Sequence, residues 1–220
     1  MTGFGPGVVR ASLADQAGGA AGPGVLPGGA AQGCLALALG ANLPSAVGDP
    51  RATLEALRPL LADTVLAWYR QGWDCPAGVA DTAPRLRWSP LFRTRPVGGP
   101  GGQPDYLNAV LLLEGPRPPD GPAAQRLLQD LQGLEQRFGR RRRERWGPRS
   151  LDLDLLWWGV LVWCSPRLAL PHPRWHQRRF VLDPLAALDP ALLPVEAVPM
   201  LPVGEAPHPL PPSLVWPEGR

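Results

Sequence analysis

Apolar residues recur in regular patterns only from residue 34 onwards, and their spacing predicts the first elements. A short apolar run that Gly40 stops is typical of a buried strand leading into a loop. After this strand, leucines and a valine recur at helical spacing. Asp49 can cap the N-terminus of that helix, and Pro50 suits its first turn. These patterns predict a strand over 34–40, a helix over 50–70 and a loop over 71–84. Two later apolar segments predict strands over 85–94 and 105–114.

The second half of the chain repeats the order of helix and then strand. From Asp120 onwards, leucines and a phenylalanine share one helical stripe, which Gly139 ends. Residues 151–158 then alternate as a strand does. We expect a hairpin over 160–163 and 167–170, and a short helix over 180–188. The overall order predicts a ferredoxin-like α+β sandwich, with helices on one face of a mostly antiparallel sheet.

Both ends of the chain differ in composition from the patterned region. Residues 1–33 include 17 Gly or Ala and show no sustained helical period, so they bury too little surface to offset the entropy of ordering. Eight prolines over residues 194–217 are typical of an extended, exposed tail. A chain of 220 residues accommodates one sizeable core. We therefore expect a disordered extension over 1–33, one domain over 34–190 and a Pro-rich tail over 191–220.

Cysteine usage and charge narrow the class of protein. Three cysteines, without disulfide or metal-binding spacing, indicate a reducing compartment. The sequence shows no run of membrane-spanning length and no secretory signal at its start, so we expect a cytoplasmic protein without membrane contact. All 22 basic residues are arginines, whose planar guanidinium groups suit phosphate binding.

Two acidic residues on one predicted strand are the first candidates for chemistry. In residues 151–155 the leucines enter the core while Asp152 and Asp154 emerge on the opposite face, about 6.6 Å apart at roughly 3.3 Å per residue. Carboxylates at that separation can flank two Mg²⁺ ions, the arrangement used in phosphoryl-type transfer. Alone, the pattern favours an ordinary half-exposed strand whose acids face solvent.

An arginine cluster directly before these acids favours a phosphate-binding role over a solvated strand. Residues 139–149 contain six arginines, which attract polyphosphate, and also a Trp-Gly-Pro-Arg turn that suits a loop closing over a ligand. A solvated charge run or a nucleic-acid patch is the alternative. On other segments, Tyr106 can stack on a flat ring, Asn108 can bond a heterocycle edge, and His172 lies between two prolines.

Several blocks, taken together, resemble the 6-hydroxymethyl-7,8-dihydropterin pyrophosphokinase family over residues 34–190. The most specific is the run from Arg145-Trp146-Gly147-Pro148-Arg149 to Asp152-Leu153-Asp154. The remaining blocks are Ala38 to Leu43, Phe92 to Thr94 with Pro96-Val97-Gly98, Gln103 to Ala109, and Pro171-His172-Pro173 leading to Arg178 and Phe180.

The resemblance implies that the pterin hydroxymethyl oxygen attacks the β-phosphorus of ATP, giving the pterin diphosphate and AMP in folate biosynthesis. It implies two Mg²⁺ ions on Asp152 and Asp154, with ATP as co-substrate. Further catalytic positions are Arg140 and Arg142, on a mobile loop. The implied ATP contacts are Arg149, His172 and Arg178, and the implied pterin contacts are Thr94, Tyr106, Asn108, Trp146 and Phe180.

Two other functions remain open at this point. A nucleic-acid-binding module would use the arginines and exposed tryptophans, and would bind oligonucleotides in a salt-sensitive, Mg²⁺-independent way. Another two-metal phosphoryl or nucleotidyl transferase would use a different acceptor. The resemblance favours small-molecule substrates, no nucleic-acid partner and a monomer.

Overall fold

The computed structural model describes residues 24–28, 33–71, 73, 83–140, 147–194, 208–213 and 215–216. The strands are β1 (Cys34–Ala41), β2 (Arg85–Trp88), β3 (Phe92–Thr94), β4 (Tyr106–Glu114), β5 (Asp152–Trp158), β6 (Trp163–Cys164), β7 (Ala169–Leu170) and β8 (His208–Pro209). The α-helices are α1 (Pro50–Arg70), α2 (Gly121–Arg137) and α3 (Arg179–Leu188), and short 3-10 turns cover Trp175–Gln177 and Pro190–Leu192.

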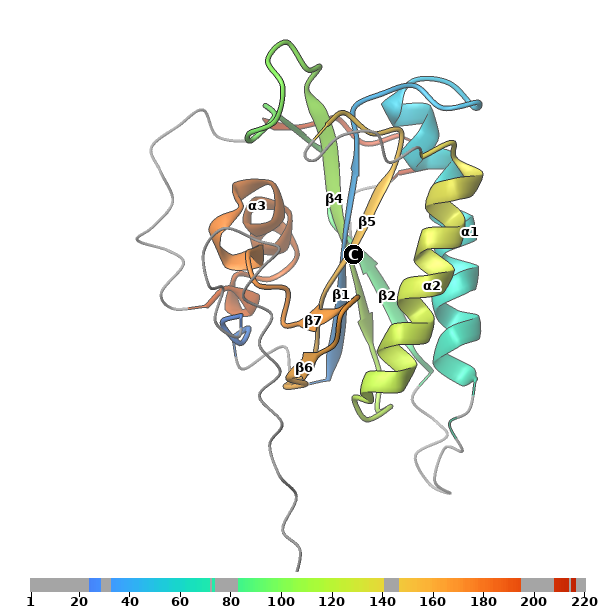
Figure 1. Cartoon of the computed structure of the whole chain (residues 1–220), viewed down its shortest axis with the longest axis vertical. Helices are drawn as coiled ribbons and strands as arrows, with labels where there is room; N and C mark the ends of the chain where they lie inside the picture. The colour runs from blue at the N-terminus through green and yellow to red at the C-terminus, as the bar shows by residue number, and fades with distance from the viewer. Residues whose placement is uncertain are drawn as a thin grey trace, which may run out of the picture.

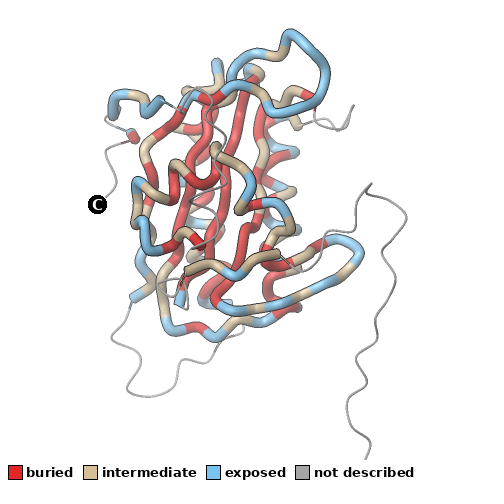
Figure 2. Tube along the Cα trace, turned by 90° about the vertical axis from the view of Figure 1, so that its left-hand side faces the viewer, coloured by how far each residue is buried: buried red, intermediate tan, exposed pale blue. Residues whose placement is uncertain are grey.

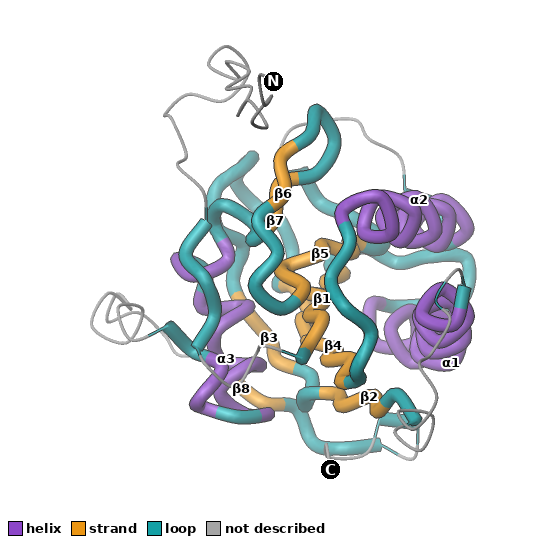
Figure 3. Tube along the Cα trace, turned by 90° about the horizontal axis from the view of Figure 1, so that it is seen from below, coloured by secondary structure: helices purple, strands orange, loops and turns teal. Residues whose placement is uncertain are grey.

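A six-stranded antiparallel sheet organises the described part of the chain. Its order is β5-β1-β4-β3-β8, and β2 pairs with β4 beside β3. Figure 3 shows these strands in cross-section, with helices on either side. The separate hairpin of β6 and β7 confirms the predicted one. No helix in the described ranges is both long and apolar enough to cross a membrane.

Helices α1 and α2 cover one face of the sheet, as the sequence predicts. Each begins at an aspartate whose carboxylate accepts a backbone hydrogen bond, from Ala52 to Asp49 and from Ala123 to Asp120. Their apolar stripes meet the sheet in the larger core cluster, which includes Leu57, Leu131 and the helix-facing residues of β1, β4 and β5. The buried residues run through the central strands in Figure 2.

Helix α3 packs on the opposite face, which corrects the expectation that all helices share one face (Figure 1). A second core cluster joins Val181 and Leu185 of α3 to Ala36, Val110 and Leu112 of the sheet. Strand β1 is buried along its whole length on both faces. A continuous apolar run, rather than an alternating one, is the sequence signal of such a doubly covered strand.

Two predicted strands depart from regular pairing. The single strand expected over 85–94 is broken into β2 and β3 because Pro90 lacks an N–H; Ser89 bridges the gap by exchanging hydrogen bonds with Val110. In β5 the register to β1 shifts between Ala36 and Leu37, a β-bulge that puts Leu156 and Trp157 on the same face.

Segments from both ends of the chain contact this domain. Val25 accepts a hydrogen bond from the indole of Trp175, and Gly28 donates to Leu192. Trp216 is 2% exposed, so the expectation of an exposed tail is wrong at this position, because the indole fills an apolar site beside Trp88. Of the extension predicted to be disordered over 1–33, residues 1–23 and 29–32 lie outside the described residues. The proposed division at 34 and 190 stays a prediction.

Candidate active site

A cavity of about 340 Å³ opens on the α3 face, where β1, β4 and β5 meet the start of α3. It brings together eight of the residues that the sequence singles out: Thr94, Tyr106, Asn108, Arg149, Asp152, Asp154, Arg178 and Phe180. Arg140 and His172 lie beside these residues rather than in the wall. Arg142 and Trp146 lie outside the described residues.

Strand β5 supplies the two carboxylates by simple alternation. Leu151, Leu153 and Leu155 are buried in the larger core, whereas Asp152 and Asp154 line the cavity. The bulge begins only after Leu155, so it leaves this alternation intact. The predicted placement of the two acids is confirmed.

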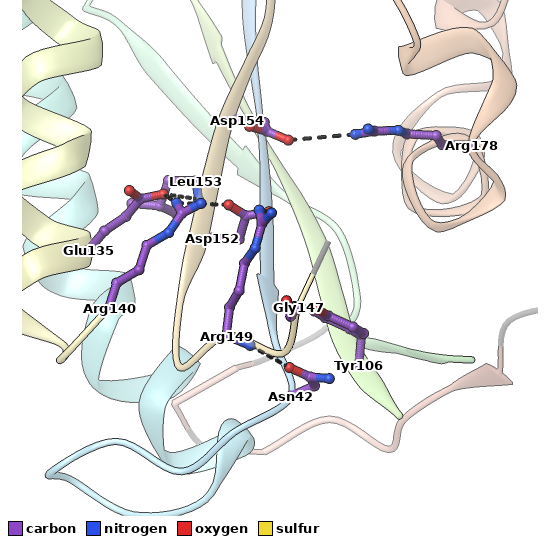
Figure 4. A network of polar contacts seen from close by, with 10 residues as sticks. All are labelled: Asn42, Tyr106, Glu135, Arg140, Gly147, Arg149, Asp152, Leu153, Asp154 and Arg178. Carbon is purple, nitrogen blue, oxygen red and sulfur yellow. Dashed lines mark hydrogen bonds and ion pairs between the residues drawn. The ribbon is translucent and has the colours of Figure 1, made fainter. Parts of the chain in front are cut away.

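Two arginines converge on Asp152 (Figure 4). Nη1 of Arg149 donates to Oδ2 over 2.6 Å. Nη1 of Arg140 lies 2.8 Å from Oδ1 as an ion pair, although this buried Oδ1 accepts no aligned hydrogen bond. Each oxygen of Asp152 therefore faces an arginine in the ligand-free chain.

Asp154 sits in a less favourable environment for its charge. Burial, together with the negative charge of Asp152, raises the pKa of Asp154 to about 6. Arg178 partly compensates from the start of α3, with its Nη1 3.6 Å from Oδ2. The fold thus holds two carboxylates side by side at an electrostatic cost that a bound cation would relieve.

Glu135 is a residue of this network that the sequence reasoning missed. It is 3% exposed on α2, where it pairs with Arg140 and accepts a hydrogen bond from the backbone of Leu153 over 2.8 Å. Burial raises the pKa of Glu135, and the charge of Arg140 opposes this shift. Its position four residues after Leu131, within the apolar stripe of α2, was the available signal.

Asn42 fixes the backbone that leads from the arginine cluster into β5. Its side-chain oxygen accepts from the backbone N–H of Arg149 over 2.7 Å, and its amide donates to Pro104 over 3.0 Å. The backbone N–H groups of Asn42 and Leu43 both donate to the carbonyl of Arg149. Asn42 thereby connects three segments at the cavity mouth, which places Arg149 next to Asp152.

The opposite end of the cavity offers an aromatic and amide environment. Asn108 donates to Oγ1 of Thr94 over 2.7 Å and lies opposite Gly40 in the β1–β4 pairing. A Cβ on Gly40 would stand 2.8 Å from the side-chain oxygen of Asn108, so only glycine leaves room there. Tyr106 and Phe180 are the aromatic residues among those that line the cavity.

The bulge in β5 holds His172 near the end of the site that carries the two carboxylates. Its backbone N–H donates to the Leu156 carbonyl over 2.6 Å, and its Nδ1 accepts from the backbone of Arg174 over 3.2 Å. Burial, with the charges of Arg178 and Arg174, lowers the pKa of His172 to about 4. The imidazole is therefore neutral at physiological pH, with its proton on Nε2.

The donor set at the cavity fits Mg²⁺ bound jointly with phosphate. No group of three or more acidic, His or Cys ligands occurs among the described residues. Mg²⁺ is usually held by one or two carboxylates together with substrate phosphates and water. Asp152 and Asp154, which line the cavity together and of which Asp154 carries a disfavoured charge, are such a pair.

Comparison with known proteins gives this arrangement a family. Residues 36–190 match the 7,8-dihydro-6-hydroxymethylpterin-pyrophosphokinase (HPPK) family. The chain belongs to the HPPK family. The match ends before the C-terminal segment that carries Trp216.

Three relatives named 2-amino-4-hydroxy-6-hydroxymethyldihydropteridine pyrophosphokinase illustrate the similarity. The Haemophilus influenzae protein is 36% identical over 149 residues, covering 68% of this chain and 77% of that protein. The Mycobacterium tuberculosis (strain H37Rv) protein is 34% identical over 165 residues, covering 71% and 72%. The Synechocystis protein is 46% identical over 105 residues, which span 47% of this chain and only 50% of that relative.

Proposed function

We propose that this HPPK-family chain transfers the pyrophosphoryl group of ATP to the hydroxymethyl oxygen of 6-hydroxymethyl-7,8-dihydropterin, giving the pterin diphosphate and AMP in folate biosynthesis. The observation that carries the proposal is one cavity with two chemically different ends. One end presents aromatic and amide groups, and the other presents paired carboxylates beside arginines. The activity of the named relatives supports the same reaction.

At the aromatic end, Tyr106 and Phe180 supply flat apolar surfaces that suit a fused heterocycle. Asn108 provides both a donor and an acceptor, and its bond to Thr94 fixes the amide orientation. The glycine at position 40 keeps the floor of this end open. A pterin, which has donors and acceptors along one edge, suits this environment.

At the charged end, Arg149, Arg178 and the neutral His172 act on the phosphates. The arginines offset the triphosphate charge, and the Nε2 proton of His172 is available as a hydrogen-bond donor. When bound to Asp152 and Asp154, Mg²⁺ supplies charge neutralisation of the phosphate oxygens. We assign two ions to this pair, with Arg140 and Arg142 as further phosphate-facing residues and Trp146 as a pterin-side residue.

The chain's own part in the reaction is positioning and electrostatics. Asn42 holds Arg149 against Asp152, and Glu135 holds Arg140 there from the helix side. Such fixed charges stabilise a transferring phosphoryl group without the cost of reorganising solvent. No covalent enzyme intermediate is needed, because the pterin hydroxyl itself is the nucleophile.

The proposal extends to fold, location and assembly. The strand order β5-β1-β4 followed by β2 and β3, with antiparallel neighbours and two helices on one face, supports a ferredoxin-like sandwich. The three cysteines lack disulfide or metal-binding spacing in the sequence, which suits a cytoplasmic protein. We propose a monomer, which size-exclusion chromatography with light scattering would test.

The deciding experiment measures AMP formation from ATP and Mg²⁺ with and without the pterin. We expect AMP only when the pterin is present, and its loss in Asp154→Ala. Asp130→Ala, an exposed aspartate on α2, is the matched control and should behave as wild type. ADP as product, or AMP formation that ignores the pterin, would reject the proposed reaction.

The nucleic-acid alternative is tested on the same preparation. It expects binding of a labelled oligonucleotide that weakens steeply with salt and does not need Mg²⁺. We expect no such binding at physiological salt, because much of the arginine charge around the cavity is paired with Asp152 and Asp154.

A further inference from the structure

The C-terminal strap, defined as residues 208–213 together with 215 and 216, runs along the outer edge of segment 89–93. It contacts this segment at three positions. The indole Nε1 of Trp216 donates to the Ser89 carbonyl over 2.9 Å, and Leu210 N–H donates to the Leu91 carbonyl over 2.7 Å. Strand β8 pairs with β3 through Arg93 and His208. The strap lies beyond residues 36–190, which match the HPPK family.

Trp216 anchors the strap in the core. Its ring is 2% exposed and meets Trp88 edge-on, with the centroids 5.4 Å apart. The guanidinium of Arg58 lies 5.1 Å from both indole rings, and its Nη1 donates to the Val215 carbonyl over 2.8 Å. A buried indole with its N–H satisfied and a cation over its face is a strong attachment.

Two further contacts tie the strap to α1. Oγ of Ser213 donates to the Glu55 carboxylate over 2.7 Å, and Arg51 donates to the Pro211 carbonyl over 3.0 Å. The strap therefore bridges helix α1 and the sheet edge. Its position is specified by side chains at several points rather than by strand pairing alone.

Segment 89–93 connects the strap to the cavity. On its inner edge, Ser89 exchanges hydrogen bonds with Val110, and Phe92 pairs with Asn108. Thr94 directly follows the segment and its Oγ1 accepts from Asn108; residues 94–98 then form part of the cavity wall. A three-residue strand such as β3 has few hydrogen bonds of its own, so pairing with β4 on one side and β8 on the other matters for its placement.

We propose that the C-terminal strap is a positioning element for the heterocycle-binding wall of the cavity, with Trp216 as its positioning residue. The inference rests on the proposed function, because it assigns the wall at Thr94 to the pterin. The strap contacts described above end on segment 89–93 and on α1, whereas Arg149, Asp152 and Arg178 come from other segments. Strap docking is therefore coupled to pterin binding and not to ATP binding.

The coupling is reciprocal, as any coupling of two binding equilibria must be. A docked strap strengthens pterin binding, and a bound pterin strengthens strap docking by the same factor. The amides of β3 should consequently exchange with solvent more slowly when the pterin is present. This effect should shrink when the anchor is removed.

The test compares Trp216→Ala with Trp73→Ala, a partly buried tryptophan that packs on Tyr69 at the end of α1, whereas the strap contacts residues 51–58 of that helix. In Trp216→Ala we expect the KM for the pterin to rise at least about five-fold, with the KM for ATP changed less than about two-fold. Trp73→Ala should leave both KM values near wild type. Hydrogen exchange of residues 92–94 should rise in Trp216→Ala and respond less to the pterin.

Arg58→Met keeps the experiment decisive if Trp216→Ala fails to fold. It removes the bond to Val215 and both cation–π contacts while retaining an apolar stem on α1, and we expect the same selective rise in pterin KM. Equal changes in both KM values, or a lower melting temperature with unchanged KM values, would overturn the positioning role. If wild type itself made no pterin-dependent AMP, the proposed function would fail instead.

Discussion

The two faces of strand β5 are built for different purposes. On the helix side, Leu151, Leu153 and Leu155 are buried against α1 and α2 and contribute to stability. On the α3 side, Asp152 and Asp154 lie close together, and burial with their mutual repulsion raises the pKa of Asp154 to about 6. The comparison shows one strand that gains stability through one face and loses part of it through the other.

The α3 side is itself divided between packing and function. Near the end of β5 the bulge turns Leu156 and Trp157 toward α3, and Trp157 packs on Trp175 with centroids 4.6 Å apart. Near the start of β5 the same side stays open as the cavity, with Gly40 leaving space beside Asn108. The bulge marks the boundary between the two uses of this face.

The largest expected effect separates activity from stability on the acidic face. Asp154→Asn should reduce turnover at least about 100-fold, because a carboxylate that offsets charge on the transferring group is lost. The same change should raise the thermal midpoint of the ligand-free protein at pH 7, since a partly desolvated charge and its repulsion by Asp152 disappear. Steady-state AMP formation and calorimetry without Mg²⁺ measure the two effects.

A lower midpoint in Asp154→Asn would contradict the assignment of an electrostatic cost to this carboxylate. Asp130→Ala, at an exposed site on α2, controls for the general effect of removing an acid. It should change neither turnover nor the midpoint.

The next effect comes from the helix side of the same strand. Leu153→Ala should lower the free energy of unfolding by about 2–5 kcal/mol, because the leucine is 3% exposed and its removal leaves a cavity. Turnover measured well below the new midpoint should stay close to wild type. Chemical denaturation together with the AMP assay checks both parts.

The opposite outcome for Leu153→Ala, a large loss of turnover in folded protein, would show that the two faces are not separable. Leu128→Ala, a partly buried leucine of α2, serves as a milder matched change and should cost less stability.

Gly40→Ala tests the open half of the α3 face. The added methyl would stand 2.8 Å from the side-chain oxygen of Asn108, so the amide must move away from its present position. We expect the KM for the pterin to rise roughly ten-fold, equivalent to about 1.4 kcal/mol, with a small change in the KM for ATP. Gly133→Ala, on α2 with open space around it, is the matched control and should have no kinetic effect.

The smallest expected effect is on the pH dependence of stability, to which His172 and Asp154 contribute in opposite directions. The pKa of His172 is lowered to about 4, so its neutral form is the folded one, and its contribution to stability is lost as the pH falls from about 6.5 toward 4. The raised pKa of Asp154 acts in the other direction below about pH 6, because protonation relieves its cost. The two contributions partly cancel in the wild-type protein without ligands.

Removing either group should reveal the contribution of the other to the pH dependence of stability. In Asp154→Asn, stability should fall more steeply on acidification than in wild type, whereas in His172→Gln it should fall less. Unfolding free energies measured between pH 4 and 7 without Mg²⁺ or nucleotide would show this. Parallel curves for all three proteins would reject both assignments.

Much of the site was predictable from local sequence. The alternation of residues 151–155 is enough to place Asp152 and Asp154 on one face, because a strand has a period of two. Asn108 and Tyr106 follow by the same rule on β4, and the capping aspartates mark where α1 and α2 begin. Glu135 was missed because an acid within an apolar stripe gains its partners, Arg140 and Leu153, only after helix and strand pack together.

Other features depended on contacts between distant segments. The placement of α3 on the second face, the break at Pro90 and the docking of Trp216 all contradict simpler sequence expectations. A Pro-rich segment has no internal period that would reveal docking. Its contacts with Ser89, Leu91 and α1 are more than a hundred residues away in sequence.

By itself, the sequence determined the order of the elements, the face on which the two aspartates lie and the blocks that place the chain in the HPPK family. Tertiary structure alone decided the pairing of Arg140, Arg149 and Arg178 with those acids, the neutral state of His172 and the course of the C-terminal strap. The reason is physical. Periodicity and capping act within a few residues, whereas burial, charge and edge pairing depend on segments that meet only in the folded chain.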